Sequence, residues 1–454
     1  MRAGPRTPPE TPALPRKSHP KLKKLSTRKG TVRSTPYRLG MEPVDFTEPR
    51  PPADGTEAFL VKLAELLHTY GTAADRLEEA MVGCARVLRV RAQFLAGATS
   101  IFVAFGDGPD QRTYLVRVDP GEVDLCKLGQ LFDVRAQVED GMLDVVEGAR
   151  RLKQIDSAGP PYSPLASITS FGLASACAAR FFGFGWRESA TSFVLGMSIG
   201  LLSRVLVRRK NASRLFEPVA AFWAALASLA IARLMPLSAS VVTLSSLIVL
   251  IPGLTLTIAV SELATRHLVS GTARLAGAMT VFLTIAVGVA LGREASGLLN
   301  SSPIPEALEA IDAIPPEWTL WLAVSLTPVA FTLLLRARLS QLLWIEVTGV
   351  AGFLVSRVGT EHFGPQLGVF LGALTVGLAA NLYSRVLRRP GAVLRVPGIL
   401  LLVPGSIGYQ SLAFFLVQDV ASGMEAAFRT AIVAVALVGG LLTANVFLRA
   451  GRTL

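Results

Sequence analysis

The sequence is poor in charge, cysteine and histidine. Only 17% of its 454 residues are charged, against about 25% in an average soluble domain, while 51% are hydrophobic. A chain of this composition is not expected to fold as a soluble enzyme. The three cysteines, Cys84, Cys126 and Cys177, form no Cys-x-x-Cys pair, so neither a disulfide framework nor a zinc site is indicated, and a reducing compartment suits them.

Two further absences limit the chemistry. The four histidines never pair at helical spacing, so we predict no metal site. No Gly-Lys dipeptide occurs, which excludes the Gly-x-x-x-x-Gly-Lys-Ser/Thr loop that holds nucleotide phosphates. We therefore expect no cofactor, and uphill transport would draw on an ion gradient or on the solute's own gradient rather than on ATP.

The net charge of +12 is unevenly distributed. Residues 1–50 carry 12 Lys or Arg against 4 Asp or Glu, residues 51–150 carry 10 against 16, and residues 151–454 carry 23 against 13. We expect residues 1–54 to be a disordered, basic, Pro-rich tail without a secretory signal. A solvated tail, an extension upstream of a start at Met41, and attraction to anionic lipid are the open interpretations.

Residues 55–160 are predicted to form a small cytosolic α+β domain. Apolar residues recur every three or four positions over Ala58–Tyr70 and Ala73–Val90, which predicts two amphipathic helices. Two strands, Ser100–Phe105 and Thr113–Val118, flank a turn rich in Gly and Asp and should pair as a hairpin. A second helical pair is expected over Leu125–Glu139 and Leu143–Gln154.

The rest of the chain reads as a polytopic, all-α membrane protein. About ten apolar stretches follow, each long enough to cross a hydrocarbon layer of about 30 Å. The expected spans are 165–182, 189–207, 216–235, 240–260, 272–292, 318–336, 340–357, 364–384, 397–417 and 427–448. A polar extracytoplasmic linker, 293–317, separates two predicted five-helix units, 161–292 and 318–454.

The two units are related by an internal repeat. A shift of 152 residues places Leu247–Gly253 on Ile399–Gly405, and Gly288 on Gly440, without a gap. Because each unit has an odd number of spans, the second should enter the bilayer in the opposite orientation. This predicts the inverted-repeat architecture of many secondary transporters.

Basic residues gather on one side of the predicted spans. With residues 55–160 inside, the cytosolic loops and flanks carry 17 Lys or Arg and the outer side carries six. The positive-inside rule then predicts a multi-pass protein of the plasma membrane, in contact with lipid, with both termini in the cytosol. Since tail and topology account for the charge, no nucleic-acid partner is expected. Homo-oligomerisation is left open.

Pro252-Gly253 and Pro404-Gly405 lie inside apolar spans at matching points of the two units. Proline lacks a backbone donor, so each helix should break or kink there. One such site alone would suggest an ordinary kink, but a matched pair favours a solute site near the midplane, where freed backbone groups meet a carboxylate and an ammonium. The predicted substrate-binding residues are Pro252, Gly253, Thr255, Ser261, Pro404, Gly405, Tyr409 and Gln410.

Two acidic residues are candidates for proton coupling. Glu346 lies deep in its predicted span, and Glu262 lies near the end of its span, where exposure to water is the alternative. A carboxylate in hydrocarbon is costly and commonly marks a pathway or a proton relay. We predict that one or both exchange a proton during transport.

Catalysis is not predicted. Gly196–Gly200 matches the Gly-x-Ser-x-Gly pattern around Ser198, but it lies in the middle of an apolar span, whereas a nucleophile elbow needs a strand, a turn and then a helix. Close helix packing is the better interpretation. A membrane-anchored hydrolase remains an alternative, although its soluble domain has His68 as its one histidine.

Three stretches, in this order, resemble the threonine/serine exporter (ThrE) family in its full-length form with both membrane halves fused. They are Leu67–Gly71 with Arg76 and Glu78, Leu250–Gly253 with Glu262 and Ser270–Arg274, and Val403–Gly405 with Gly408, Tyr409 and Gly423. The likeness covers about residues 57–450, with Glu262 where we expect aspartate. The resemblance implies export of threonine and serine driven by the proton-motive force. Some relatives with divided halves are associated with succinate export, so dicarboxylate export is an alternative, for which Arg274 is the nearest predicted cation.

Overall fold

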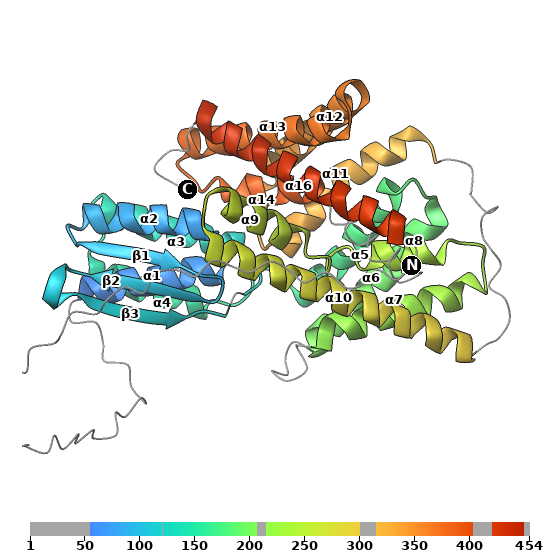
Figure 1. Cartoon of the computed structure of the whole chain (residues 1–454), viewed down its shortest axis with the longest axis horizontal. Helices are drawn as coiled ribbons and strands as arrows, with labels where there is room; N and C mark the ends of the chain where they lie inside the picture. The colour runs from blue at the N-terminus through green and yellow to red at the C-terminus, as the bar shows by residue number, and fades with distance from the viewer. Residues whose placement is uncertain (1–54, 120, 207–214, 300–314, 403–419, 449–454) are drawn as a thin grey trace, which may run out of the picture. The chain divides into compact units, whose positions relative to one another are not determined.

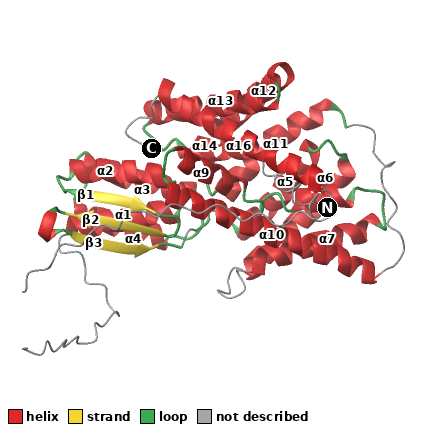
Figure 2. Ribbon diagram, viewed as in Figure 1, coloured by secondary structure: helices red, strands yellow, loops and turns green. Residues whose placement is uncertain are grey.

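The computed structural model describes residues 55–119, 121–206, 215–299, 315–402 and 420–448 (Figure 1). Contacts divide the chain into residues 1–50 and 51–454, and all described residues belong to the second unit. The predicted basic tail and the middle of the predicted polar linker lie outside the described residues. Within them the chain is mostly helical, with one small sheet (Figure 2).

The first part of the described chain is an antiparallel sheet of order β1-β2-β3 with four helices. The elements are α1 (Gly55–Thr69), α2 (Ala74–Val87), β1 (Ala92–Ala96), β2 (Ser100–Phe105), β3 (Arg112–Arg117), α3 (Leu125–Glu139) and α4 (Val145–Ser157). The predicted hairpin is confirmed, because β2 and β3 pair antiparallel with Phe105 opposite Arg112. A 3-10 turn, Gly108–Asp110, connects them.

The strand β1 is missing from the prediction, which continues the second helix to Val90. That prediction is wrong: α2 ends at Val87, and Arg89 adopts a positive φ of 58°. In β1, Phe94 and Ala96 are buried against the core. Two inward apolar residues in a five-residue strand are too few for periodicity to distinguish the strand from the end of a helix.

The core of this part lies between the sheet and α1. Leu60, Leu63 and Leu67 recur at helical spacing and are fully buried. They share one apolar cluster with Ile101 and Phe105 of β2. Burying a side chain of this size contributes about 1.5–3 kcal/mol. The sequence periodicity therefore fixed which face of α1 meets the sheet.

The rest of the described chain is helical. Its helices are α5 (Pro164–Phe181), α6 (Trp186–Leu206), α7 (Phe216–Ala232), α8 (Ala239–Ser246), α9 (Gly253–Ala264), α10 (Leu268–Leu299), α11 (Glu317–Leu334), α12 (Leu342–Phe363), α13 (Pro365–Leu387), α14 (Ala392–Leu402) and α16 (Val420–Phe447). Six helices of the described ranges, α6, α10, α11, α12, α13 and α16, are long and apolar enough to cross a membrane. The apolar helices α7, α9 and α14 are shorter. A polytopic helical membrane protein is confirmed, and the count of ten spans stays a prediction.

The short helix α9 lies where several membrane helices meet. It contacts α10, α14 and α16, while α14 in turn packs against α11, α12 and α13 (Figure 1). The helices α7 and α10 pack along one another, as do α13 and α16.

The sheet-containing part, residues 55–157, is joined to the membrane helices by backbone hydrogen bonds at the start of α3. The N–H groups of Leu125 and Cys126 donate to the carbonyls of Leu335 and Arg336 at 2.9 and 3.2 Å. The guanidinium of Arg336 lies 3.6 Å from the buried carboxylate of Asp124. The corner between α11 and α12 therefore anchors the sheet-containing part.

Candidate functional site

The predicted interruption at Pro252-Gly253 is present in the structure. Within the predicted span 240–260, α8 ends at Ser246 and α9 begins at Gly253, as the predicted break requires. Pro252 has φ −77° and ψ 46°, outside the helical region, and the N–H of Gly253 turns back to the carbonyl of Ile251 at 2.7 Å. The missing proline donor and the steric clash of its ring explain why the two helices do not continue as one.

Hydroxyl groups follow the interruption along α9. Thr257 is buried and donates to the carbonyl of Gly253 at 3.0 Å, so its hydroxyl satisfies its own helix. Thr255 and Ser261 are half-buried, and their hydroxyls have no hydrogen-bond partner among the described residues. The hydroxyls of these two side chains are therefore available to hydrogen-bond a solute.

The second predicted interruption cannot be described in the same way. Pro404, Gly405, Tyr409 and Gln410 lie outside the described residues. The helix α14, which precedes them in the chain, ends at Leu402. It contains Pro397 within its helical residues.

Glu262 is fully buried on the last turn of α9. Its Oε1 accepts a hydrogen bond from the backbone N–H of Ala74 at 2.9 Å and lies 3.1 Å from Nε of Arg274. Ala74 is the first residue of α2, so the carboxylate caps that helix at the positive end of its dipole. The other oxygen, Oε2, is buried without a partner among the described residues. Glu262 thus joins the sheet-containing part to α9 and α10 and does not face water.

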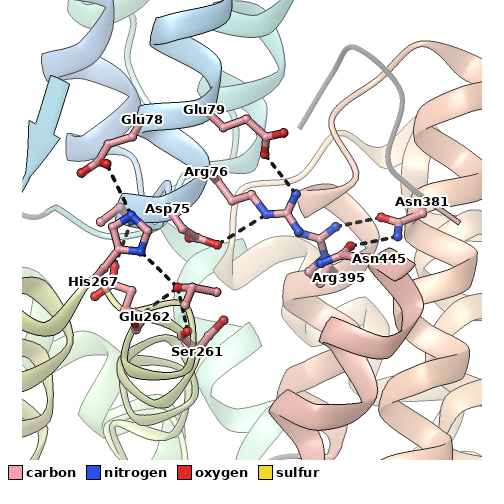
Figure 3. A network of polar contacts seen from close by, with 12 residues as sticks. Asp75, Arg76, Glu78, Glu79, Ser261, Glu262, His267, Asn381, Arg395 and Asn445 are labelled. Atoms are coloured by element: carbon pink, nitrogen blue, oxygen red, sulfur yellow. Dashed lines mark hydrogen bonds and ion pairs between the residues drawn. The ribbon is translucent and has the colours of Figure 1, made fainter. Parts of the chain in front are cut away.

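Charged residues of α2 surround this contact (Figure 3). Glu78 lies 3.4 Å from Nε2 of His267, the residue directly before α10. Arg76 lies 3.8 Å from both Asp75 and Glu79. Oδ1 of Asp75 is buried and has no partner within the described part of the chain.

Arg395 approaches α2 from the other side, on the first turn of α14 (Figure 3). It is half-buried, and its guanidinium donates to Oδ1 of Asn381 on α13 at 3.0 Å. Asn381 is fully buried, and its amide donates in turn to Oδ1 of Asn445 on α16 at 3.0 Å. No carboxylate of the described residues pairs with Arg395, although the charges of Arg76 and Asp75 act on it across the junction.

Glu346 lies apart from this network. It is half-buried on α12, and its polar neighbour is Ser325 of α11. The helices α12 and α9 both contact α14, so the two predicted coupling carboxylates sit on helices with a common neighbour.

Ser198 has no catalytic surroundings. Its hydroxyl donates to the carbonyl of Leu195 at 2.7 Å and accepts from Nε1 of Trp223 at 2.9 Å, in the middle of α6. A Cβ on Gly196 would lie 2.8 Å from the carbonyl oxygen of Phe171 on α5. The motif therefore serves close helix packing, as predicted.

Neither His68 nor Cys84 of the sheet-containing part is activated for hydrolysis. Burial, followed by the charge of Arg274, lowers the pKa of His68, whose Nε2 lies 3.2 Å from the carbonyl of Ala98. Burial raises the pKa of the Cys84 thiol to about 12, which keeps it protonated.

Sequence reasoning missed most of the network around Glu262. Asp75 was not singled out, and Arg395 was counted only as one of the basic residues that set topology. The contacts of Asn381, a polar residue inside a predicted span, are not predicted either. The available signal was the charge run Asp75–Glu79 directly after a glycine turn, which an ordinary solvated helix face would also explain.

Comparison with known proteins connects this architecture to one family. The family model described as "Putative threonine/serine exporter" matches residues 58–296, and the model "Threonine/Serine exporter, ThrE" matches residues 321–447. No solved structure matches the chain.

Three fungal relatives extend the match. Pheromone-regulated membrane protein 10 of Saccharomyces cerevisiae is 29% identical over 72% of this chain, and that of Candida albicans is 26% identical over 83%. An uncharacterised Schizosaccharomyces pombe protein is 24% identical over 84%. The chain covers 43%, 34% and 51% of these proteins, so it spans about half their length or less. With both family models matched in order across the sheet-containing part and the membrane helices, the chain belongs to the threonine/serine exporter (ThrE) family and is a membrane protein.

Proposed function

We propose that the chain is a secondary exporter of small polar amino acids, threonine and serine, at the plasma membrane. The observation that carries this proposal is the interrupted helix at Pro252-Gly253, set among membrane-length helices in a chain of the ThrE family. Interrupted helices place backbone donors and acceptors inside an apolar bundle, where a solute's charged groups bind without a buried charged side chain.

The proposed architecture is a cytosolic α+β domain followed by two inverted five-helix repeats. Equivalent glycine contacts support the repeat. A Cβ added at Gly288 of α10 would collide with the carbonyl oxygen of Pro218 on α7, and one at Gly440 of α16 would collide with that of Phe370 on α13. Both members of the second pair lie 152 positions after their counterparts, which is the shift that aligns the two halves in sequence.

The proposed solute site lies at the two interruptions. Pro252, Gly253, Thr255 and Ser261 form its first half, and the hydroxyls of Thr255 and Ser261, which have no partner in the described ranges, suit a hydroxyl-bearing solute. The second half is assigned from sequence alone to Pro404, Gly405, Tyr409 and Gln410. Both termini are placed in the cytosol on the strength of the basic loops.

Glu346 and Glu262 are the proposed proton-exchanging groups. Protonation of Glu262 would remove the negative charge that holds Arg274 and caps α2. Proton uptake at this residue would therefore loosen the contact between the soluble part and α9, which links coupling to a structural change. Glu346 has no cation among its described contacts. Its protonation would therefore lower the free-energy cost of placing the carboxyl group in an apolar span.

Counterflow of labelled threonine or serine in reconstituted vesicles tests this proposal. Transport driven by a pH gradient is expected to fall in Glu346→Gln and Glu262→Gln, while exchange at equal pH persists. Glu425→Gln, at an exposed carboxylate on α16, is the matched control. Unaltered gradient-driven transport in the double variant would exclude both carboxylates from coupling.

Dicarboxylate export is the second candidate. The predicted cation for it, Arg274, is already paired with Glu262. Arg395 has no carboxylate partner among the described residues, so its guanidinium could bind a carboxylate of the solute. This observation favours dicarboxylate export as the second candidate. Succinate that competes with labelled serine better than threonine does would favour it.

A further inference from the structure

A basic corner lies where α12 begins and α13 ends. It carries four arginines, one before α12 and three at the end of α13: Arg338, Arg385, Arg388 and Arg389. The two helices pack along one another, and the rings of Trp344 and Tyr383 meet at this end with their centroids 5.9 Å apart. Because Arg338 is two residues after Arg336, whose carbonyl holds α3, the basic corner lies next to the sheet-containing part.

Polar contacts connect the two sides of the basic corner. Oε1 of the buried Gln341 accepts a hydrogen bond from the backbone N–H of Arg338 at 3.2 Å. The side chains of Gln341 and Arg389 both hydrogen-bond to Tyr383. The charge of Arg338 also acts on this phenol. One tyrosine thus brings an arginine from each side of the corner to the same point.

The positive charge of the basic corner is not balanced by nearby acidic residues. Residues 318–345 and 362–418 contain no Asp or Glu. The nearest acidic residue along the chain, Glu346, has its polar neighbour on α11. Neither Arg338 nor Arg388 forms an ion pair with a carboxylate of the described ranges. The corner therefore carries a local excess of positive charge, which attracts an anion.

Arg388 ends α13 in a left-handed conformation, with φ 51° and ψ 40°. Glycine is the usual residue at this position after a helix, because a Cβ raises the cost of a positive φ. The Arg388 side chain is exposed and makes no hydrogen bond within the part of the chain that the structure describes. Attraction to the negative end of the helix dipole offsets part of the conformational cost, and an anionic ligand would offset more of it.

Exposed apolar side chains lie on the same turns as the arginines. Five of them belong to the start of α12 and the end of α13: Leu339, Leu343, Trp344, Leu382 and Val386. Both helices are long and apolar enough to cross a membrane, so these side chains are placed to contact acyl chains. Tryptophan is enriched at the level of the lipid headgroups. Cationic, aromatic and apolar groups therefore occur together, as a phospholipid requires.

We propose that the basic corner binds the phosphate of an anionic phospholipid in the leaflet next to the sheet-containing part, with Arg338 and Arg388 on the phosphate and Trp344 beside the glycerol. A guanidinium offers a fork of N–H donors that fits phosphate oxygens. A zwitterionic lipid has the same phosphate, but its ammonium would bring positive charge back to the corner. Free phosphate would gain nothing from the tryptophan and the leucines, so a lipid with net negative charge is the ligand that fits best.

Quenching of Trp344 by brominated lipid tests the site in the purified full chain, reconstituted in phosphatidylcholine vesicles. The probes are brominated phosphatidylglycerol and brominated phosphatidylcholine, each added as the same minor fraction of the bilayer. The signal of Trp344 is the difference between the parent and Trp344→Phe, which keeps a ring against Tyr383. Brominated phosphatidylglycerol is expected to quench Trp344 more strongly. Arg338→Gln and Arg388→Gln should each lower the affinity for it by about fivefold, the contribution of one arginine near a charged membrane surface.

The matched control removes two other arginines from membrane-length helices. Arg293→Gln combined with Arg429→Gln changes exposed positions of α10 and α16 and lowers the net charge by the same amount as the test pair. This control should leave the quenching of Trp344 unchanged. Thermal unfolding in phosphatidylcholine shows whether each variant is folded. The double lysine variant, Arg338→Lys with Arg388→Lys, keeps both charges and should bind phosphatidylglycerol more tightly than the double glutamine variant.

Each result decides the inference. A preference for phosphatidylglycerol that is lost in the double glutamine variant, and restored at least in part by lysine, supports the site. Equal quenching by the two lipids in the parent, or a preference that survives in the folded glutamine variant, overturns it. Lysine that binds no better than glutamine would also overturn it, as would displacement of the lipid by inorganic phosphate. None of these measurements involves amino-acid transport, so the exporter proposal is tested separately.

Discussion

Replacing Glu262 by alanine is expected to weaken the junction between the sheet-containing part and the membrane helices by about 4 kcal/mol. The substitution leaves the Arg274 guanidinium, whose side chain is 14% exposed, without its ion-pair partner at 3.1 Å. Breaking a buried pair by removing one partner costs about 3–5 kcal/mol. The lost cap on the Ala74 N–H adds about 1 kcal/mol, and the orphaned Oε2 that disappears with the side chain offsets part of this.

The measurement is unfolding in detergent, with a double-mutant cycle formed by Glu262→Ala, Arg274→Ala and both together. The double variant is expected to be less destabilised than the sum of the single ones, because it no longer buries an unpaired charge. Glu425→Ala is the control. It breaks an ion pair of 3.4 Å with Arg429 in which both side chains are more than half exposed, so we expect a change below about 1 kcal/mol.

Two results would refute the reasoning. One is a destabilisation by Glu262→Ala no larger than that of the control. The other is strict additivity in the cycle, which would mean that Glu262 and Arg274 do not depend on each other despite their distance. Either would remove Glu262 as the group that joins α2 to α9.

Three further outcomes follow from individual contacts. Gly288→Val should abolish stable folding, because its Cβ would strike the α7 backbone, whereas Gly277→Val on the same helix has no neighbour within 4 Å and should be tolerated when expression and unfolding midpoints are compared. Cys84, whose pKa is raised to about 12, should resist maleimide at neutral pH in the folded protein and react once the protein is unfolded. Mass spectrometry of the labelled peptide measures this, and modification of Cys84 in the folded protein would contradict the prediction. The pKa of His68 is lowered on folding, so the unfolded chain binds more protons below about pH 6.5 and stability should fall as the pH is lowered through that range. A His68→Asn variant with an unchanged pH slope would show that another group is responsible.

Local sequence signals predicted the elements well where one face of an element is buried. The leucines of α1 and the α3 boundaries follow directly from apolar spacing, and the interruption at Pro252 follows from backbone chemistry. The strand β1 was not predicted, because five residues are too few to show a clear alternation of apolar and polar side chains.

The candidate site was predicted only in part. Glu262 was recognised as an acidic residue beside an apolar span, but its partner Ala74 lies 188 residues earlier in the chain. No sequence pattern specifies that a backbone N–H of one helix will meet a carboxylate of another helix so far away. The sequence shows only the positive charge of Arg395, and the preference of basic residues for the cytosolic side of a membrane protein already explains that charge.

The sequence by itself determined that this chain is a helical membrane protein of the ThrE family with a small sheet-containing part before it. Hydropathy and the proline interruption depend on neighbouring residues in the chain, and the repeat depends on positions 152 residues apart. All three can therefore be recognised in the sequence without knowledge of the fold. The tertiary structure alone decided that Glu262 is a buried cap on α2, that Arg274 is paired with it, and that Arg395 donates to the buried amide of Asn381. The physical reason is that the free energy of a charge depends on burial and on its partners, and in this protein those partners come from distant parts of the chain.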